Sequence, residues 1–214
     1  MKKVDILKRI EDAGVIAVVR GSSKEEAFKA SEACLKGGIK GIELTFTVPQ
    51  ADQVIADLIA NHCENSNTVI GAGTVLDAVT ARLAIMAGAE FIVSPTFDKE
   101  TAKLCNLYQI PYIPGCMTTT EMKEALRYGV DIIKLFPGSA YDPSIIKAFK
   151  APLPHINIMP TGGVSLENMV DWFAAGAVTV GVGGNLLAPA EIGHFDQVTE
   201  IATQYMKKYL AIKG

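Results

Sequence analysis

One lysine in this sequence lies inside an apolar run, where a charged side chain is unusual. Lys134 stands in the segment Ile132–Pro137, between aliphatic residues and Phe136. Burying an unpaired ammonium is costly, so such a lysine is either paired with a carboxylate or held in its neutral form. A neutral lysine amine is a nucleophile toward ketones and aldehydes. The alternatives are a lysine that extends from a strand end into water and a buried lysine–glutamate pair without chemistry.

A carboxylate in a second apolar run could be the partner of this lysine. Glu43 lies in the run 41–46, and on a strand it would face the same side as Thr45. Lys134 would share a face with Phe136 in the same way. If both faces form the interior of one barrel, Glu43 and Lys134 converge in an arrangement that marks functional sites. We then expect Lys134 to be the Schiff-base nucleophile and Glu43 the proton shuttle, with a structural ion pair as the alternative.

Two glycine pairs could bind an anion. They stand in Thr161-Gly162-Gly163 and in Gly183-Gly184-Asn185, each after a late apolar run. Glycine lets backbone N–H groups approach a phosphate closely, and the loops after the last two strands of a barrel often bind one. We expect Gly162, Gly163, Gly184 and Asn185 to bind phosphate. The alternative is a pair of tight turns without a ligand.

Three further polar residues follow apolar runs and fit a small acid. Arg20 can bind a carboxylate or phosphate with both arms of its guanidinium, although it could also form a surface salt bridge. Thr74 and Thr161 can donate hydroxyl groups to a small carboxylate. Threonines are common at strand ends, so an ordinary structural role is the alternative for both.

Eight short apolar runs must position these residues. The runs are rich in β-branched residues and bounded by glycine or proline, as buried parallel strands are. They cover 15–20, 41–46, 68–73, 91–95, 111–115, 132–137, 157–161 and 179–183. Between them, helical patterns are predicted over 23–36, 49–61, 77–87, 118–128 and 165–175, and a last amphipathic helix over 195–210.

A short sequence pattern recurs between a helical segment and the strand that follows it. Helical segments end in a glycine, at Gly38, Gly88, Gly129 and Gly176, and an apolar run follows within a few residues. Eight strand–helix units predict an α/β fold, a closed (β/α)8 TIM barrel formed by residues 1–214 as a single domain with an N-terminal helix. The competing fold, an open doubly wound sheet, would need a Gly-x-Gly-x-x-Gly after the first strand, which the sequence lacks.

Composition excludes several other classes of protein. The 214 residues are 49% hydrophobic and 20% charged with a net charge of −3, so nothing favours nucleic-acid binding. No apolar stretch is long enough for a membrane helix, and the charged N-terminus is not a signal peptide, so we expect a cytoplasmic protein. The four cysteines lack metal-ligand spacing and are expected to be free thiols. The three histidines do not cluster, and we expect no metal and no cofactor.

Six motifs in this order resemble the 2-keto-3-deoxy-6-phosphogluconate (KDPG) aldolase family, which includes 4-hydroxy-2-oxoglutarate (KHG) aldolases. They are Gly41-Ile42-Glu43-Leu44-Thr45, Ile70-Gly71-Ala72-Gly73-Thr74-Val75, Phe91-Ile92-Val93-Ser94-Pro95, Ile113-Pro114-Gly115, Ile133-Lys134-Leu135-Phe136-Pro137 and Pro160-Thr161-Gly162-Gly163-Val164. The resemblance covers nearly the whole chain. It implies a metal-independent class I aldolase on a TIM barrel, a homotrimer acting on a phosphorylated 2-keto acid in the Entner–Doudoroff pathway.

The resemblance also assigns residues. It implies a Schiff base on Lys134, acid/base catalysis by Glu43, the pyruvate carboxylate near Thr74, and a site lined by Pro95, Phe136 and Thr161. The chain departs from the family pattern at Thr47, where many members carry an arginine that Arg20 could replace, and at Asn185, where a serine is frequent. Rival functions are a sugar-phosphate epimerase, which usually uses paired acids or metal-binding histidines, and a sugar-phosphate-binding protein, which needs no buried lysine.

Overall fold

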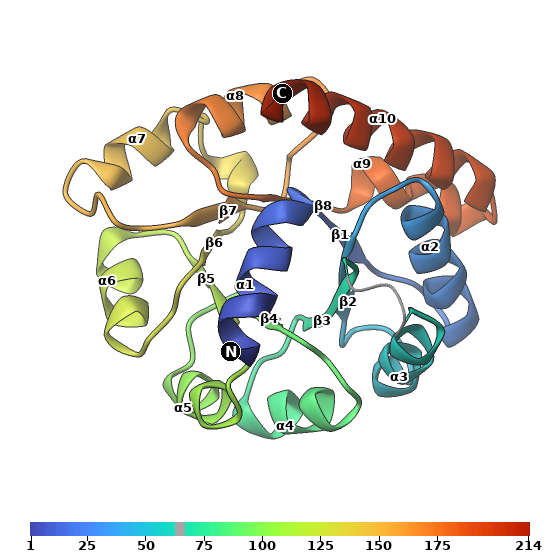
Figure 1. Cartoon of the computed structure of the whole chain (residues 1–214), viewed down its shortest axis with the longest axis horizontal. Coiled ribbons are helices and arrows are strands. Elements are labelled where there is room, and N and C mark those ends of the chain that lie inside the picture. Colours follow the sequence, from blue (N-terminus) through green and yellow to red (C-terminus); the bar gives the residue numbers. More distant parts are fainter. Residues whose placement is uncertain (63–66) are drawn as a thin grey trace.

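The computed structural model describes residues 1–62 and 67–214, and within these ranges eight parallel strands form a barrel (Figure 1). They are β1 (Val15–Val19), β2 (Gly41–Thr45), β3 (Val69–Gly73), β4 (Ile92–Ser94), β5 (Tyr112–Cys116), β6 (Ile133–Leu135), β7 (Ile158–Pro160) and β8 (Val180–Val182). Each strand from β1 to β6 pairs with its successor, and β1 also pairs with β8. A parallel bridge between Thr161 and Gly181 joins β7 to β8 and closes the ring. The predicted (β/α)8 fold is confirmed.

Helices cover the outside of the barrel between successive strands (Figure 1). The helices in the described ranges are α1 (Lys2–Ala13), α2 (Lys24–Lys36), α3 (Ala51–His62), α4 (Ala78–Met86), α5 (Lys99–Tyr108), α6 (Thr119–Arg127), α7 (Ile145–Lys150), α8 (Met169–Ala175), α9 (Gly184–Leu187) and α10 (Phe195–Lys213), with 3-10 turns at Gly138–Ala140 and Ala188–Ile192. The six helices predicted between or after the strands are all present. Thr118 and Glu121 form the capping box at the start of α6.

The structure corrects the helix assignment in two respects. Helices α5, α7 and α9 are additional to the predicted ones. Helix α8 begins at Met169, four residues later than the predicted start at residue 165. The later start has a local cause, because the side chain of Asn168 accepts the N–H of Ser165 and donates to the carbonyl of Gly163, and these bonds hold the segment in a turn.

Helix α1 covers the end of the barrel at which the strands begin. Gly14 connects it directly to β1, and in Figure 1 it lies across the ring of strands. Ile6 and Ile10 on its inner face are buried. Arg9 ties the helix to the barrel by an ion pair with Glu90 and a hydrogen bond to the carbonyl of Thr68. The opposite end, where the strands finish, is therefore the end left for an active site.

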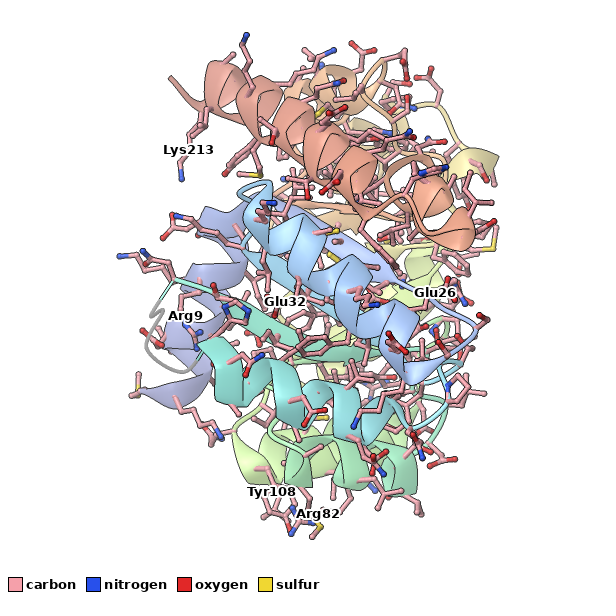
Figure 2. The ribbon with its side chains drawn as sticks, turned by 90° about the vertical axis from the view of Figure 1, so that its right-hand side faces the viewer. Arg9, Glu26, Glu32, Arg82, Tyr108 and Lys213 are labelled. Carbon is pink, nitrogen blue, oxygen red and sulfur yellow. The ribbon has the colours of Figure 1, made fainter. Side chains whose placement is uncertain are left out.

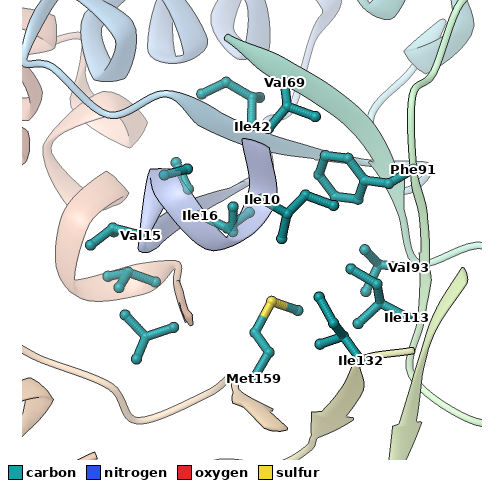
Figure 3. Close-up of a cluster of buried hydrophobic side chains, with 14 of the residues drawn as sticks. Ile10, Val15, Ile16, Ile42, Val69, Phe91, Val93, Ile113, Ile132 and Met159 are labelled. Atoms are coloured by element: carbon teal, nitrogen blue, oxygen red, sulfur yellow. The ribbon is translucent and has the colours of Figure 1, made fainter. Parts of the chain in front are cut away.

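Apolar side chains fill the barrel next to α1. Figure 3 shows Ile10 of α1 with Ile16, Val93, Ile113 and Met159 in one buried cluster. Glycines on neighbouring strands leave room for the larger side chains. A Cβ on Gly71, for example, would lie 2.5 Å from the ring of Phe91. Such large-and-small alternation packs a small barrel without voids.

The described cysteines are buried and unlinked. Cys34, Cys105 and Cys116 are free thiols, as predicted, and Cys63 lies outside the described residues. Burial raises the pKa of each of these three thiols to about 12. Within residues 1–62 and 67–214, the structure contains no helix that is long and apolar enough to cross a membrane.

Candidate active site

Lys134 and Glu43 meet inside the barrel, as strand parity predicted. Lys134 is on β6 and Glu43 on β2, and the Nζ of Lys134 donates a hydrogen bond of 3.1 Å to the Oε1 of Glu43. The lysine is 5% exposed and the glutamate 0%. The second oxygen of Glu43, Oε2, accepts no hydrogen bond from any described residue. The carboxylate thus holds the lysine with one oxygen, and its other oxygen is buried without a hydrogen-bond partner among the described residues.

A glycine on the adjacent strand makes room for the carboxylate of this pair. Gly73 on β3 pairs in register with Thr45 on β2, and a Cβ on Gly73 would overlap Oε1 of Glu43 and lie 2.5 Å from its Cγ. The absence of a side chain at Gly73 explains why the long side chain of Glu43 fits inside the barrel, where branched apolar residues are usual. Gly115 on β5, the register partner of Lys134, instead leaves room for the backbone of Pro95.

Phe136 contributes an aromatic face to the lysine. Its ring centroid lies 5.3 Å from the Nζ of Lys134, which is within the range of a cation–π contact. The two residues are two positions apart along the chain and share the inward direction that parity predicted. Lys134 is therefore bounded by a carboxylate and by an aromatic ring.

A chain of hydroxyl contacts leads from the barrel interior to Arg20. The Oγ1 atoms of Thr45, which is buried, and Thr47 are 2.8 Å apart, and Nη1 of Arg20 donates to Thr47 Oγ1 at 3.5 Å. Arg20 follows β1 and is exposed. The guanidinium thus lies beside Thr47, the position at which the resemblance described above implies an arginine. The contact between Arg20 and Thr47 was not foreseen as a hydrogen bond.

Thr74 has an unusual backbone. It follows β3 directly and has a φ of 55°, in the left-handed region that a β-branched residue rarely adopts. Strained residues of this kind cluster at functional sites, where the surrounding structure holds them. The role of Thr74 as a substrate contact stays a prediction.

The glycine loops after β7 and β8 lie together. Gly162 and Gly163 have φ values of 87° and 80°, which suit glycine alone. The Oγ1 of Thr161 is buried and has no hydrogen-bond partner among the described residues. Asn185 donates its side-chain amide to the carbonyl of Val164 at 3.2 Å, so it links the two loops. The amide that was expected to face a phosphate has this structural partner here.

A cavity of about 360 Å³ opens at the ends of β1 and β8. It brings Arg20 together with Gly184, and its lining comprises Val18, Arg20, Gly21, Ser22, Glu26, Gly183, Gly184, Leu187 and Glu191. A larger cavity of about 580 Å³ lies beside α2 and the start of α10 and is lined by residues such as Lys36 and His62. The lining of this larger cavity includes none of the predicted site residues. We therefore place the candidate site at the strand ends that border the smaller cavity and at the Lys134–Glu43 pair, although neither member of the pair lines that cavity.

The described residues contain no cluster of side chains that could bind a metal ion. No group of three or more His, Cys, Asp or Glu residues that could hold an ion occurs in residues 1–62 and 67–214. His62 is the last residue of α3, and its Nε2 lies 2.7 Å from Oε1 of Glu32, which Figure 2 labels on the neighbouring helix α2. That contact gives it an ordinary structural role.

A parallel barrel that buries a lysine and a carboxylate together at the inner ends of its strands has the architecture of a TIM-barrel enzyme. The sequence profile of the KDPG and KHG aldolases matches residues 6–203. The chain belongs to this aldolase family, and it is therefore a lyase.

Individual relatives agree with the family profile. The chain is 33% identical to a 2-dehydro-3-deoxy-phosphogluconate aldolase of Treponema pallidum, over 95% of this chain and 97% of that protein. It is 32% identical to a 2-dehydro-3-deoxy-6-phosphogalactonate aldolase of Escherichia coli, over 91% and 94%. A solved structure of KDPG aldolase from Legionella pneumophila, with pyruvate captured as a covalent carbinolamine, matches with a TM-score of 0.83 and 27% identity over 95% and 97% of the two chains.

Proposed function

We propose that this aldolase cleaves 2-dehydro-3-deoxy-6-phosphogluconate to pyruvate and glyceraldehyde 3-phosphate through a Schiff base on Lys134. The hydrogen bond between the buried Lys134 and Glu43 is the observation that carries the proposal. An amine that loses its proton to a neighbouring carboxylate is a nucleophile for the keto group of the substrate. The covalent capture of pyruvate in the Legionella relative supports the same chemistry here.

The first half of the reaction forms the imine. The amine of Lys134 attacks C2 of the keto acid, and the carbinolamine loses water to give a protonated imine, which withdraws electrons from C3. Glu43 lies within hydrogen-bond distance of the same nitrogen, so it can hold the proton that the amine gives up and return one to the departing hydroxyl. Phe136 bounds the lysine on another side.

The second half breaks the carbon–carbon bond. Glu43, acting through a water molecule, takes the proton of the C4 hydroxyl, the C3–C4 bond breaks, and its electrons pass into the imine to form an enamine. Glyceraldehyde 3-phosphate leaves. Glu43 then gives a proton to C3, and hydrolysis of the imine releases pyruvate and restores Lys134.

The remaining site residues bind the substrate in this proposal. Thr74 binds the carboxylate, and Thr45, Pro95 and Thr161 line the site around the reacting carbons. Gly162, Gly163, Gly184 and Asn185 bind the phosphate from the ends of β7 and β8. Arg20, held beside Thr47, supplies positive charge to an anionic end of the substrate.

Two related keto acids are alternative substrates, and the activity assay described below distinguishes them from the proposed one. The E. coli relative is named for the galactonate-derived keto acid, which differs from the gluconate-derived one at C4, and the family profile includes KHG aldolases, whose substrate yields glyoxylate with pyruvate. We place the gluconate-derived acid first because the Treponema relative is named for it.

We propose that the enzyme is a cytoplasmic homotrimer, as the family resemblance implies. A stripe of exposed apolar residues supports association: Leu76 precedes α4, and Val79, Leu83 and Met86 lie on it. On the neighbouring α5, Leu107 is exposed as well. Monomers rarely leave such a contiguous stripe in water. Light scattering after gel filtration should give three times the mass of the chain, and the mass of a monomer would contradict the proposal.

The function is tested by pyruvate release. Purified enzyme is given each of the three keto acids, and pyruvate is measured with lactate dehydrogenase and NADH. We expect the highest kcat/KM with 2-dehydro-3-deoxy-6-phosphogluconate and no loss of rate with a chelator such as EDTA. A higher kcat/KM with the galactonate epimer would reassign the substrate. Pyruvate release from none of the three would overturn the proposal.

A further inference from the structure

A buried tyrosine outside the barrel interior holds the turn between β4 and α5. Tyr112, the first residue of β5, is 4% exposed, and Ser94, the last of β4, is 1% exposed. The hydroxyl of Tyr112 lies 2.7 Å from Oγ of Ser94 and accepts the N–H of Asp98 at 3.1 Å. It also lies 3.2 Å from the carbonyl oxygen of Thr96, to which Ser94 Oγ donates. Residues 94, 96 and 98 of the turn are thus tied to one phenol.

These contacts are mutually consistent as donors and acceptors. The N–H of Asp98 donates to the Tyr112 oxygen, and Ser94 Oγ–H donates to the Thr96 carbonyl. The Tyr112 hydroxyl then donates either to Ser94 Oγ or to the Thr96 carbonyl. Every hydroxyl and amide proton in this hydrogen-bond network has an acceptor. A buried network whose hydrogen bonds are all satisfied fixes its members in one geometry. Burial also raises the pKa of Tyr112 to about 12, so the hydroxyl keeps its proton at any assay pH near neutrality.

The turn that Tyr112 holds contains Pro95, which is one of the predicted site residues. Its residue Pro95 follows β4 and approaches β5 so closely that a Cβ on Gly115 would overlap the Pro95 carbonyl and lie 3.1 Å from Pro95 Cα. Gly115 is in turn the register partner of Lys134. Pro95 is therefore placed over the strand that borders the proposed nucleophile, and the backbone of the turn decides where it lies.

We propose that Tyr112 is a positioning residue, whose hydroxyl, with that of Ser94, fixes the turn 94–98 so that Pro95 holds the keto acid against Lys134. The inference rests on the proposed function and extends it to two residues that do not face the barrel interior. Contacts that hold a substrate equally well in the ground state and in the transition state change KM and leave kcat unaltered. Loss of the phenol hydroxyl should therefore weaken productive binding and leave the chemistry of Lys134 and Glu43 intact.

Substitution by phenylalanine can remove the hydroxyl of Tyr112 while the packing of its aromatic ring is kept. The ring of Phe97, in the same turn, lies 6.4 Å from the ring of Tyr112 and 5.7 Å from that of Tyr128. Tyr112→Phe keeps these ring contacts and removes the three hydroxyl contacts. Tyr205→Phe is the matched control, because Tyr205 on α10 is also buried and loses the same atom far from the turn.

The experiment compares Tyr112→Phe, Ser94→Ala, Ser94→Thr and Tyr205→Phe with the wild-type enzyme. We measure kcat and KM for the keto acid and the rate at which borohydride traps pyruvate on the protein. In Tyr112→Phe and Ser94→Ala we expect KM to rise about tenfold, trapping at subsaturating pyruvate to slow about tenfold, and kcat to change by less than about twofold. Ser94→Thr keeps a hydroxyl and should restore KM, and Tyr205→Phe should match the wild type.

Each outcome decides the matter. A wild-type KM and trapping rate in folded Tyr112→Phe would overturn the inference, and Ser94→Ala gives the same decision if Tyr112→Phe fails to fold. A purely structural role would lower the thermal midpoint or the fraction of active protein and leave KM unchanged, which would also overturn it. A wild-type enzyme that traps no pyruvate would overturn the proposed function itself, and the positioning role with it.

Discussion

The Nζ of Lys134 lies 3.1 Å from the Oε1 of Glu43, although the two residues are 91 positions apart in the chain. Their strands, β6 and β2, are not neighbours in the barrel, because β5, β4 and β3 lie between them. The contact therefore crosses the barrel interior and exists only when the ring of strands is complete. Catalysis by this pair should depend on the integrity of the whole barrel rather than on one local motif.

Glu43→Gln separates imine formation from turnover. The amide keeps the size of the side chain and can still contact Lys134, but it cannot accept or return a proton. We expect pyruvate to be trapped on the variant while kcat for cleavage falls by about 100-fold or more, the scale on which general acid–base groups act. The check is a steady-state assay run beside borohydride trapping on the same preparation. Wild-type turnover would remove Glu43 from the mechanism.

Removal of one partner should also destabilise the fold. Lys134→Met keeps an apolar stem but leaves the buried Glu43 without its cation, a change that costs about 3–5 kcal/mol when a buried pair is broken. The double variant Lys134→Met with Glu43→Gln contains no unpaired charge and should recover most of that loss. The free energies of unfolding in urea of the two single variants and the double variant give the coupling free energy between Lys134 and Glu43. Additive single effects would show that Lys134 and Glu43 are not energetically coupled in the folded state.

Gly73→Ala tests the space that the neighbouring strand leaves for the carboxylate. The new Cβ would overlap Oε1 of Glu43 and lie 2.5 Å from its Cγ, so the side chain must leave its position beside Lys134. We expect a folded protein, destabilised by about 1–3 kcal/mol, whose kcat falls by at least about tenfold. Circular dichroism establishes the fold and the pyruvate assay measures kcat. An unchanged kcat would show that the observed position of Glu43 is not required.

Much of the fold could be predicted from the sequence because parallel strands are apolar throughout and each strand–helix unit repeats. The glycines at the helix ends, such as Gly88 and Gly176, do adopt positive φ. Helix α5 was missed because it lacks this signal: Gln109, with a φ of 56°, takes the left-handed position at its end. Helices α7 and α9 are six and four residues long, too short for a periodic pattern to stand out.

The site was predictable where residues share the inward face of a strand. Alternation placed Glu43 and Lys134 in the interior, and the structure brings them into contact. It could not indicate the bond between Arg20 and Thr47, which joins the ends of two strands. The alternation of residues also could not reveal the hydrogen-bond network of Tyr112. Tyr112 lies on the outside of the barrel, and its sequence context is that of an ordinary core residue. Such contacts depend on tertiary packing alone.

The three buried thiols predict how the stability of the folded protein changes with pH. Burial raises the pKa of Cys34, Cys105 and Cys116 to about 12, whereas an unfolded thiol has a pKa of about 8.5. The folded state therefore favours the neutral thiol. This contribution to stability is complete below pH 8.5, approximately, and is lost as the pH rises toward about 12. The free energy of unfolding, measured in urea, should fall as the pH rises above about 9.

The same shift protects the thiols from thiol–disulfide exchange. At pH 8 a thiol with a pKa of about 12 is ionised in about one molecule in ten thousand. In a Cys63→Ser background, which leaves the three buried thiols, native protein should react negligibly with DTNB, and protein in urea should release three equivalents of thionitrobenzoate. Rapid reaction of the native protein would contradict the burial of these side chains.

Borohydride trapping tests the central claim most directly. Wild-type enzyme is incubated with pyruvate and sodium borohydride, digested, and analysed by mass spectrometry, with Lys134→Ala and a sample without pyruvate as controls. The account predicts a reduced pyruvate adduct on the peptide that contains Lys134, absent from both controls, together with loss of cleavage activity in the variant. An adduct on another lysine, or a folded and active wild-type enzyme that forms none, would contradict it.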